Sequence, residues 1–202
     1  MKKNTSFGFT LVETLVAMTI GVVVMIAMGT FARDIFFTNS IQGGSFSTAQ
    51  DARTIIRTML NELRSASQGS DGSYPIITAG TSTLTFFSDI NGDGNKERIR
   101  YFLATTTLNK GVITPTGTPL AYTGSEVISI LAYNVRNSSS TPIFNYYNGT
   151  FTGTSTPLTQ PVSVSAIRLV QINLTLDSDP NRSPLPRTYT TDVTLRNLKD
   201  NL

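Results

Sequence analysis

An uncharged, mostly apolar run near the start of the chain constrains the fold more than any other feature. It extends over nineteen residues, from Thr14 to Ala32. As a helix that rises about 1.5 Å per residue, the run would be roughly 28 Å long, close to the hydrocarbon core of a bilayer at about 30 Å. Two lysines precede it, and the balanced pair Arg33 and Asp34 follows it. The positive-inside bias therefore predicts a single-pass protein with a cytoplasmic N-terminus and an extracytoplasmic remainder.

The helical pattern continues beyond the membrane-length run, but there it has two different faces. One face is apolar and the other is charged, as expected for a helix that packs on a protein core. The apolar face consists of Ala49, Ala52, Ile56, Met59, Leu60 and Leu63, and the charged face of Asp51, Arg53, Arg57 and Glu62. We predict one long helix from residue 9 to residue 66, with a bend or break at Gly43 and Gly44, because glycine costs about 1 kcal/mol in a helix relative to alanine.

Strand-like alternation replaces the helical pattern after Tyr74. The predicted strands are 83–87, 98–103, 127–133, 143–147, 167–176 and 189–195. In the last two, apolar and polar residues alternate, as a sheet with one buried face requires. The predicted fold class is α+β, with the amphipathic half of the long N-terminal helix packed against an antiparallel β-sheet. Surface loops rich in turn residues are predicted at 137–142, 150–161 and 177–186.

Composition excludes several classes of function. The chain has no cysteine and no histidine, which removes disulfides, thiol catalysis, cysteine-ligated metal sites and the commonest general base. The formal charge is +3, and without Lys2 and Lys3 the sixteen basic residues become fourteen, against thirteen acidic ones. No electrostatic case for nucleic-acid binding remains. The phosphate-binding and nucleophile-elbow motifs of common enzymes are also missing, so we expect no catalytic residues.

The residues just before the apolar run distinguish three interpretations of the N-terminus. An uncleaved signal anchor explains the run but not Glu13, an acid at its start. A conventional secretory signal peptide would be cut after the run, where residues 27–29 form a weak small-residue site. In the third interpretation, a short basic leader ends at Gly8 and the membrane segment begins at Phe9. The combination of Gly8, Phe9 and Glu13 with an unbroken apolar run favours this third interpretation.

This combination resembles the class III signal of type IV prepilins and type II secretion pseudopilins. The resemblance implies that prepilin peptidase cuts between Gly8 and Phe9 and that Phe9 becomes N-methylphenylalanine. It also implies assembly with other pilin or pseudopilin subunits, from the bacterial inner membrane into a pilus or pseudopilus fibre. The chain would then divide into a leader, 1–8, a membrane-spanning and assembly half of the helix, 9–37, an amphipathic half, 38–68, and an extracytoplasmic β-rich pilin-like domain, 69–202.

Glu13 lies where a charge is costly. An acidic residue at the centre of a membrane helix costs about 2.5 to 3.5 kcal/mol on insertion scales, less near the interface, and usually has a defined partner. Cleavage after Gly8 would create such a partner, the α-amine of Phe9 on a neighbouring subunit. Between packed apolar helices the low dielectric would strengthen this pair, which would also fix the axial register of the subunits. Because the equivalent glutamate recruits subunits in the resembled family, we expect Glu13 to be an assembly contact.

Further segments resemble minor pilins and J-type minor pseudopilins more than major pilins. They are 86–103, 143–149, 167–176 and 187–198. The resemblance implies a minor subunit of the assembly-initiating complex at the fibre tip. A major shaft subunit and a membrane-anchored adhesive tip module are the alternatives. The exposed aromatic patch of such a module would consist of Phe144, Tyr146, Tyr147 and Phe151, although alternating aromatic residues on a strand more often pack in a core.

An acidic turn between the first two predicted strands has the alternate spacing of a calcium loop. Asp89, Asn91 and Asp93, followed by a glycine, match the first half of such a loop. The match fails at the twelfth position, where Arg100 replaces a bidentate glutamate. A β-hairpin connection is the favoured interpretation, and a calcium site is the alternative. A second acidic loop, 177–181, would complete such a site only if the fold brought it near, and no other cofactor is predicted.

Overall fold

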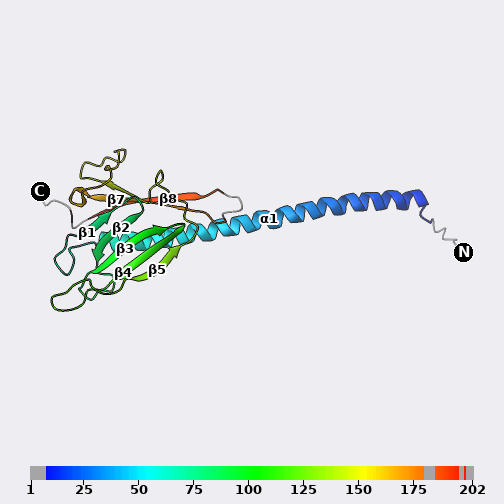
Figure 1. The fold of residues 1–202 in the computed structure, drawn as a ribbon. Coiled ribbons are helices and arrows are strands. Elements are labelled where there is room, and N and C mark those ends of the chain that lie inside the picture. The colour runs from blue at the N-terminus through cyan, green and yellow to red at the C-terminus, as the bar shows by residue number, and fades with distance from the viewer. Residues whose placement is uncertain (1–7, 180–184, 196–197, 199–202) are drawn as a thin grey trace. The chain divides into compact units, whose positions relative to one another are not determined.

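The computed structural model describes residues 8–179, 185–195 and 198, of which 40–45 are described by their backbone alone. One long helix, α1 (Leu11–Arg64), precedes the strands and a short 3-10 helix, η1 (Val164–Ala166). The strands are β1 (Ile76–Ala79), β2 (Thr83–Ser88), β3 (Glu97–Ala104), β4 (Thr107–Ile113), β5 (Val127–Ala132), β6 (Phe144–Tyr147), β7 (Leu169–Leu176) and β8 (Arg187–Thr194) (Figure 1). The chain forms two compact units, Met1–Gly44 and Ser45–Leu202. The predicted α+β class is confirmed.

Helix α1 is slightly shorter at both ends than predicted. It begins at Leu11 because Thr10 caps it, and it ends at Arg64, just before a stretch of turn residues. The helix is continuous through Gly43 and Gly44, so the predicted break is wrong. Helix propagation is cooperative, so two glycines inside a long helix weaken it without ending it.

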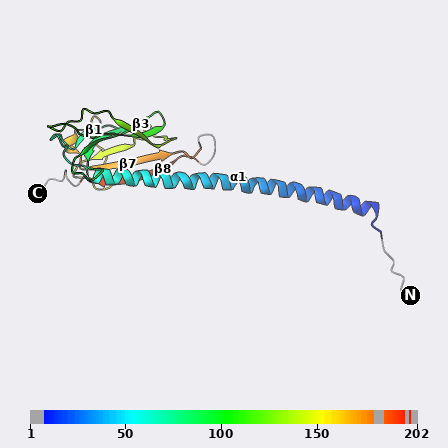
Figure 2. The same ribbon diagram turned by 90° about the horizontal axis from the view of Figure 1, so that it is seen from below.

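The last turns of α1 bury their apolar face, as predicted. Ala52, Met59 and Leu63 are fully buried. Burying side chains as large as Met and Leu contributes about 1.5 to 3 kcal/mol each, so this face anchors the end of α1 in the core. Figures 1 and 2 both show these turns, coloured cyan, against the strands. Glu62 was predicted to lie on the charged outer face, but it faces the larger sheet and is largely buried.

The strands form two antiparallel sheets rather than one. The larger sheet has the order β1-β2-β3-β4-β5, and the smaller sheet has the order β6-β7-β8. Two strands of the larger sheet, β1 and β4, were not predicted. In the smaller sheet Val170 is paired with Val193, in the register that buries the apolar residues of both strands. An isolated bridge between Val135 and Leu176 joins the segment after β5 to the end of β7.

Both sheets contribute to a single core, which lies within the second unit. Its buried residues extend along the chain from Ala52 to Leu195. Tyr146 is buried in it and donates its hydroxyl hydrogen to the carbonyl of Gly80 at 2.8 Å. Buried hydroxyl groups require such partners. The second unit therefore has a core of its own, which is the property expected of an independent domain.

Strand β6 buries most of the aromatic residues that an adhesive surface would need. Phe144, Tyr146 and Tyr147 are at most 6% exposed. Phe151 is half-buried, and its ring packs on Tyr147 with 4.4 Å between the centroids. The core interpretation is confirmed for the three aromatic residues of β6, so the alternative of an exposed patch made of all four residues does not hold.

The predicted surface loops are mostly exposed, but two polar residues anchor them. Asn137 is buried, and its amide donates to the carbonyl of Asn173 at 2.8 Å. Asp177 is also buried, and its Oδ2 lies 3.2 Å from Nε of Arg136. Residues 180–184 of the third loop lie outside the described part of the chain.

Candidate functional site

A reciprocal cap between Thr10 and Glu13 closes the start of α1. The backbone N–H and the hydroxyl group of Thr10 both donate to Oε2 of Glu13, each at 2.9 Å. In return, the backbone N–H of Glu13 donates to Oγ1 of Thr10 at 3.3 Å. This capping box satisfies amide groups that a helix start leaves unpaired. Glu13 thus has a hydrogen-bonding partner in its own chain. We did not predict this capping box, although a threonine three residues before a glutamate is its usual sequence signal.

The residues of the predicted cleavage site lie exposed in front of the helix. Phe9 is 85% exposed. A side-chain carbon added at Gly8 would meet no atom within 4 Å, and Gly8 does not have a positive φ. The described fold therefore does not itself require glycine at this position. Recognition by another protein can still account for the glycine at this position.

The first unit presents an apolar helical surface. The segment Leu11–Asn39 is long and apolar enough to cross a membrane, judged by length and composition. Its large hydrophobic side chains are all exposed. The hydroxyl groups of Thr14, Thr19 and Thr30 donate to backbone carbonyls three residues earlier, so they add no unpaired polar group. An apolar surface of this extent requires lipid or other apolar helices around it.

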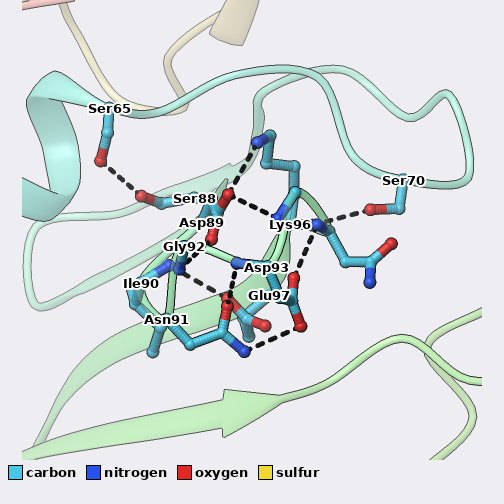
Figure 3. Close-up of polar contacts among 12 residues, drawn as sticks. Ser65, Ser70, Ser88, Asp89, Ile90, Asn91, Gly92, Asp93, Lys96 and Glu97 are labelled. Atoms are coloured by element: carbon cyan, nitrogen blue, oxygen red, sulfur yellow. Dashed lines mark hydrogen bonds and ion pairs between the residues drawn. The ribbon is translucent and has the colours of Figure 1, made fainter.

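The acidic turn belongs to the second unit and connects β2 to β3 (Figure 3). The N–H groups of Gly92 and Gly94 donate to the two carboxylate oxygens of Asp89, at 2.7 and 3.0 Å. The ammonium group of Lys96 lies 3.3 Å from Oδ2 of the same carboxylate. Burial by itself would raise the pKa of Asp89, but the two N–H donors and Lys96 together lower it below its ordinary value.

The backbone of this turn is a β-hairpin connection. Strands β2 and β3 pair antiparallel on either side of it. Gly92 and Gly94 have φ values of 77° and 90°, which glycine adopts without strain. Within the turn, the side-chain amide of Asn91 donates to Oδ2 of Asp93 at 2.9 Å. The predicted β-hairpin connection is therefore confirmed by the backbone of this turn.

The second acidic loop has partners of its own. Asp177 pairs with Arg136, and its Oδ1 accepts the N–H of Asp179 at 3.2 Å. Asn181, the third predicted member, lies outside the described residues. Within the part of the chain that the structure describes, no three Asp, Glu, His or Cys side chains are grouped so that they could hold a metal ion.

Comparison with known proteins identifies the N-terminal segment. Residues 3–29 match the family model described as the prokaryotic N-terminal methylation motif, a segment that contains Gly8, Phe9 and Glu13. No curated protein is significantly similar to the chain in sequence. The motif implies processing by prepilin peptidase, and with the apolar helix it indicates a location in the inner membrane or a pilus. Pilin-family proteins are structural and non-enzymatic. The chain is therefore similar to type IV pilins and pseudopilins in its N-terminal segment, where it carries a prokaryotic N-terminal methylation motif.

Proposed function

We propose that the chain is a minor pilin or pseudopilin that assembles non-covalently into a type IV pilus or a type II secretion pseudopilus. Prepilin peptidase cuts between Gly8 and Phe9, and the new amine of Phe9 is methylated. The observation that carries the proposal is a capped glutamate, Glu13, at the head of an exposed apolar helix within the matched motif. The lysines ahead of the helix favour a cytoplasmic N-terminus and an extracytoplasmic second unit. The functional division at residues 8, 37 and 68 is part of the same proposal.

Glu13 is suited to two tasks because its carboxylate has two oxygen atoms. Both donors of Thr10 contact Oε2, which leaves Oε1 available to another donor. Hydrolysis of the bond after Gly8 leaves a carboxylate on that residue and an amine on Phe9. The amine of a neighbouring subunit can then approach Oε1 while Thr10 keeps the helix capped. Between apolar helices, such a charge pair is stronger than it would be in water.

Intact-mass measurement of the membrane-extracted protein tests the processing step. We expect the protein from cells with a prepilin peptidase to have lost Met1 to Gly8 and gained one methyl group. The same chain from cells without the peptidase should keep its full mass. A mature chain that starts near Thr30 would show conventional signal-peptide cleavage and would contradict the proposal.

Two substitutions at Glu13 separate its charge from its cap. Glu13→Gln keeps a capping acceptor, because glutamine also serves in a capping box, whereas Glu13→Ala removes both charge and cap. We expect both variants to be cleaved normally and both to enter fibres poorly, as measured by the sheared fibre fraction. Thr10→Ala, which weakens the cap and keeps the charge, is the control and should assemble better than either. Normal assembly of Glu13→Gln would show that the charge is not needed.

The minor role is supported by the resemblance of residues 86–103, 143–149 and the two closing strands to minor subunits. Copies per fibre, counted by quantitative mass spectrometry, should be few relative to the most abundant subunit. A fibre composed mainly of this chain would make it the major subunit instead. The adhesive alternative has lost its main support, because β6 buries the aromatic residues on which it depended.

A further inference from the structure

Two arginines on α1, Arg53 and Arg57, have no acidic partner. Both are exposed and lie four residues apart, so their side chains are neighbours on one flank of the helix. Neither forms an ion pair with any other residue that the structure describes. Like charges at this spacing repel each other. A negatively charged partner beside the two guanidinium groups would therefore be favoured.

These arginines form one wall of a groove, and strand β8 forms the other wall. The groove is lined by Arg53, Ile56 and Arg57 of α1 and by residues 188–191 of β8. Successive side chains of a strand point to opposite faces, so four consecutive residues line one groove when it runs along the edge of the strand. Ile56 is buried and gives the groove an apolar base. Figures 1 and 2 both show β8 alongside the cyan turns of α1.

The edge of β8 that borders this groove is open. Strand β8 is the last strand of the smaller sheet and pairs with β7 alone among the described strands. Its residues 188–191 make no hydrogen bond to any other described backbone outside that pairing. Asp192, the one acid of β8, accepts a hydrogen bond from Gln171 and does not line the groove. The groove thus combines two unpaired positive charges with a free strand edge.

We infer that this groove binds an extended segment of another protein that carries two acidic residues at alternate positions. The segment adds a strand to the smaller sheet beside β8, and its two carboxylates pair with Arg53 and Arg57. The spacings agree, because four residues of a helix advance about 6 Å and two residues of a strand advance about 6.6 Å. Alternate side chains of the segment point to one face, so both acids face α1.

The open backbone of β8 favours a protein segment over other anions. A phosphate group, whether free, in a lipid or in a nucleic acid, would pair with the arginines but would offer no donor to the carbonyl groups of the strand edge. A peptide backbone supplies donors and acceptors in the alternation that the edge presents. Only a protein segment therefore satisfies both walls of the groove.

Binding of synthetic peptides to the full-length protein in uncharged detergent tests this inference. The probe is a labelled peptide of threonine and valine with two glutamates separated by one residue, and fluorescence anisotropy measures its dissociation constant. The same peptide with glutamine in place of both glutamates should bind about 10-fold more weakly, because two charge pairs are lost. No detectable binding of the probe at about 5 mM, or equal binding of the glutamine peptide, would overturn the inference.

A second peptide tests the strand pairing separately from the charges. It keeps both glutamates, but the backbone nitrogens that would face β8 are methylated. We expect this peptide to lose binding, because it can no longer donate hydrogen bonds to the strand edge. Unchanged binding would show that the arginines alone hold the peptide and would contradict the inferred strand.

Substitutions on α1 locate the bound peptide. Arg53→Gln and Arg57→Gln each remove one exposed charge, so each variant should fold and bind the probe about 3-fold more weakly, and the double variant about 10-fold. Arg64→Gln, at an exposed arginine of the same helix that does not line the groove, is the matched control and should leave binding unchanged. Equal weakening by all three single substitutions would attribute binding to net charge and reject the groove.

Competition distinguishes a protein segment from a general anion. Unlabelled peptide should displace the probe, whereas inorganic phosphate, vesicles with anionic lipid and single-stranded DNA at the same concentration of negative charge should not. Displacement by any of these three as effective as that by the peptide would overturn the inference. None of these results bears on the assembly proposal, since that depends on Phe9 and Glu13.

Discussion

Glu62, near the end of α1, links the helix to two strands of the larger sheet. Its Oε2 accepts the hydroxyl of Tyr101 on β3, and its Oε1 accepts the ammonium group of Lys110 on β4. The side chains of Glu62 and Lys110 are only 11% and 13% exposed. At this burial each charge depends on the other, because water cannot replace a lost partner.

Lys110→Met should therefore destabilise the second unit strongly. Removing one partner of a buried ion pair costs about 3 to 5 kcal/mol, because the other charge is left unpaired. We expect this loss in guanidinium unfolding of residues 45–202, the unit that contains the whole core. The double variant Glu62→Gln with Lys110→Met should recover much of it, since Tyr101 keeps an acceptor and no lone charge remains.

The ion pair between Arg100 and Glu126 is the control for this prediction. Its side chains are 38% and 22% exposed, so Glu126→Gln should cost less than about 1 kcal/mol. If Lys110→Met cost as little, the buried pair would not stabilise the fold in the way that its burial suggests.

Single residues were the hardest feature to predict. Helical spacing placed Glu62 among the exposed charges, because spacing gives the angle around the helix but not the width of the buried surface. Thr10 differs from Glu62, since its capping role could have been predicted from the sequence alone.

At the scale of elements, strand β5 ends the larger sheet and is paired only with β4 among the described strands. Val127, Ile128 and Ile130 are 71%, 54% and 51% exposed. An apolar edge strand with free N–H and C=O groups readily pairs with another chain. For the proposed fibre subunit, this edge is a liability before assembly.

The variant with both Ile128→Lys and Ile130→Lys should make the isolated second unit more monomeric. Charges on an edge strand oppose pairing, while exposed positions change the free energy of unfolding little, by about 1 kcal/mol or less. Sedimentation velocity over a range of concentrations measures the association. The pair Gln50→Lys and Asn61→Lys, on the exposed side of α1, adds the same charge elsewhere and should leave association unchanged. An equal effect of both pairs would attribute the change to net charge rather than to β5.

The elements themselves could mostly be predicted from periodicity, and the exceptions have physical causes. Strand β4 was missed because Asn109, Lys110 and Gly111 suggest a turn. In the fold, Lys110 reaches Glu62, and a side chain at Gly111 would collide with the carboxylate of Glu126. Tertiary contacts thus make a strand of residues with low strand propensity. Strand β1 is short, but its pair of isoleucines between a proline and a glycine was a usable signal.

At the scale of the whole molecule, the distribution of titrating groups predicts a stability that is flat near neutral pH and falls at both extremes. The chain has no histidine, the side chain that normally titrates between pH 5 and 8. On the acid side, hydrogen bonds from Arg100 lower the pKa of Glu126, more than burial raises it, and hydrogen bonds from Ser73 lower that of Asp71. A lowered folded-state pKa means that this stabilisation is complete above about pH 5 and is lost as the pH falls through the folded-state values.

On the alkaline side, two buried tyrosines dominate. Burial, and then the charge and hydrogen bond of Glu62, raise the pKa of Tyr101, and burial raises the pKa of Tyr146. A raised folded-state pKa stabilises the fold fully below the ordinary tyrosine value, and the stabilisation is lost as the pH rises above about 10. Above about pH 10, each tyrosine that stays protonated only in the folded state should lower the free energy of unfolding by about 1.4 kcal/mol per pH unit.

Guanidinium unfolding of residues 45–202 between pH 3 and pH 11.5, at about half-unit steps, measures this profile. Tyr146→Phe should reduce the alkaline slope by about 1.4 kcal/mol per pH unit, because one proton-releasing group is removed. Tyr133→Phe, at a side chain that is 66% exposed, is the matched control and should leave the slope unchanged. If Tyr133→Phe and Tyr146→Phe changed the alkaline slope equally, the buried hydroxyl groups would not cause the loss of stability at high pH. A stability maximum confined to a narrow range near pH 6.5 would contradict the predicted plateau, since no histidine is present to produce it.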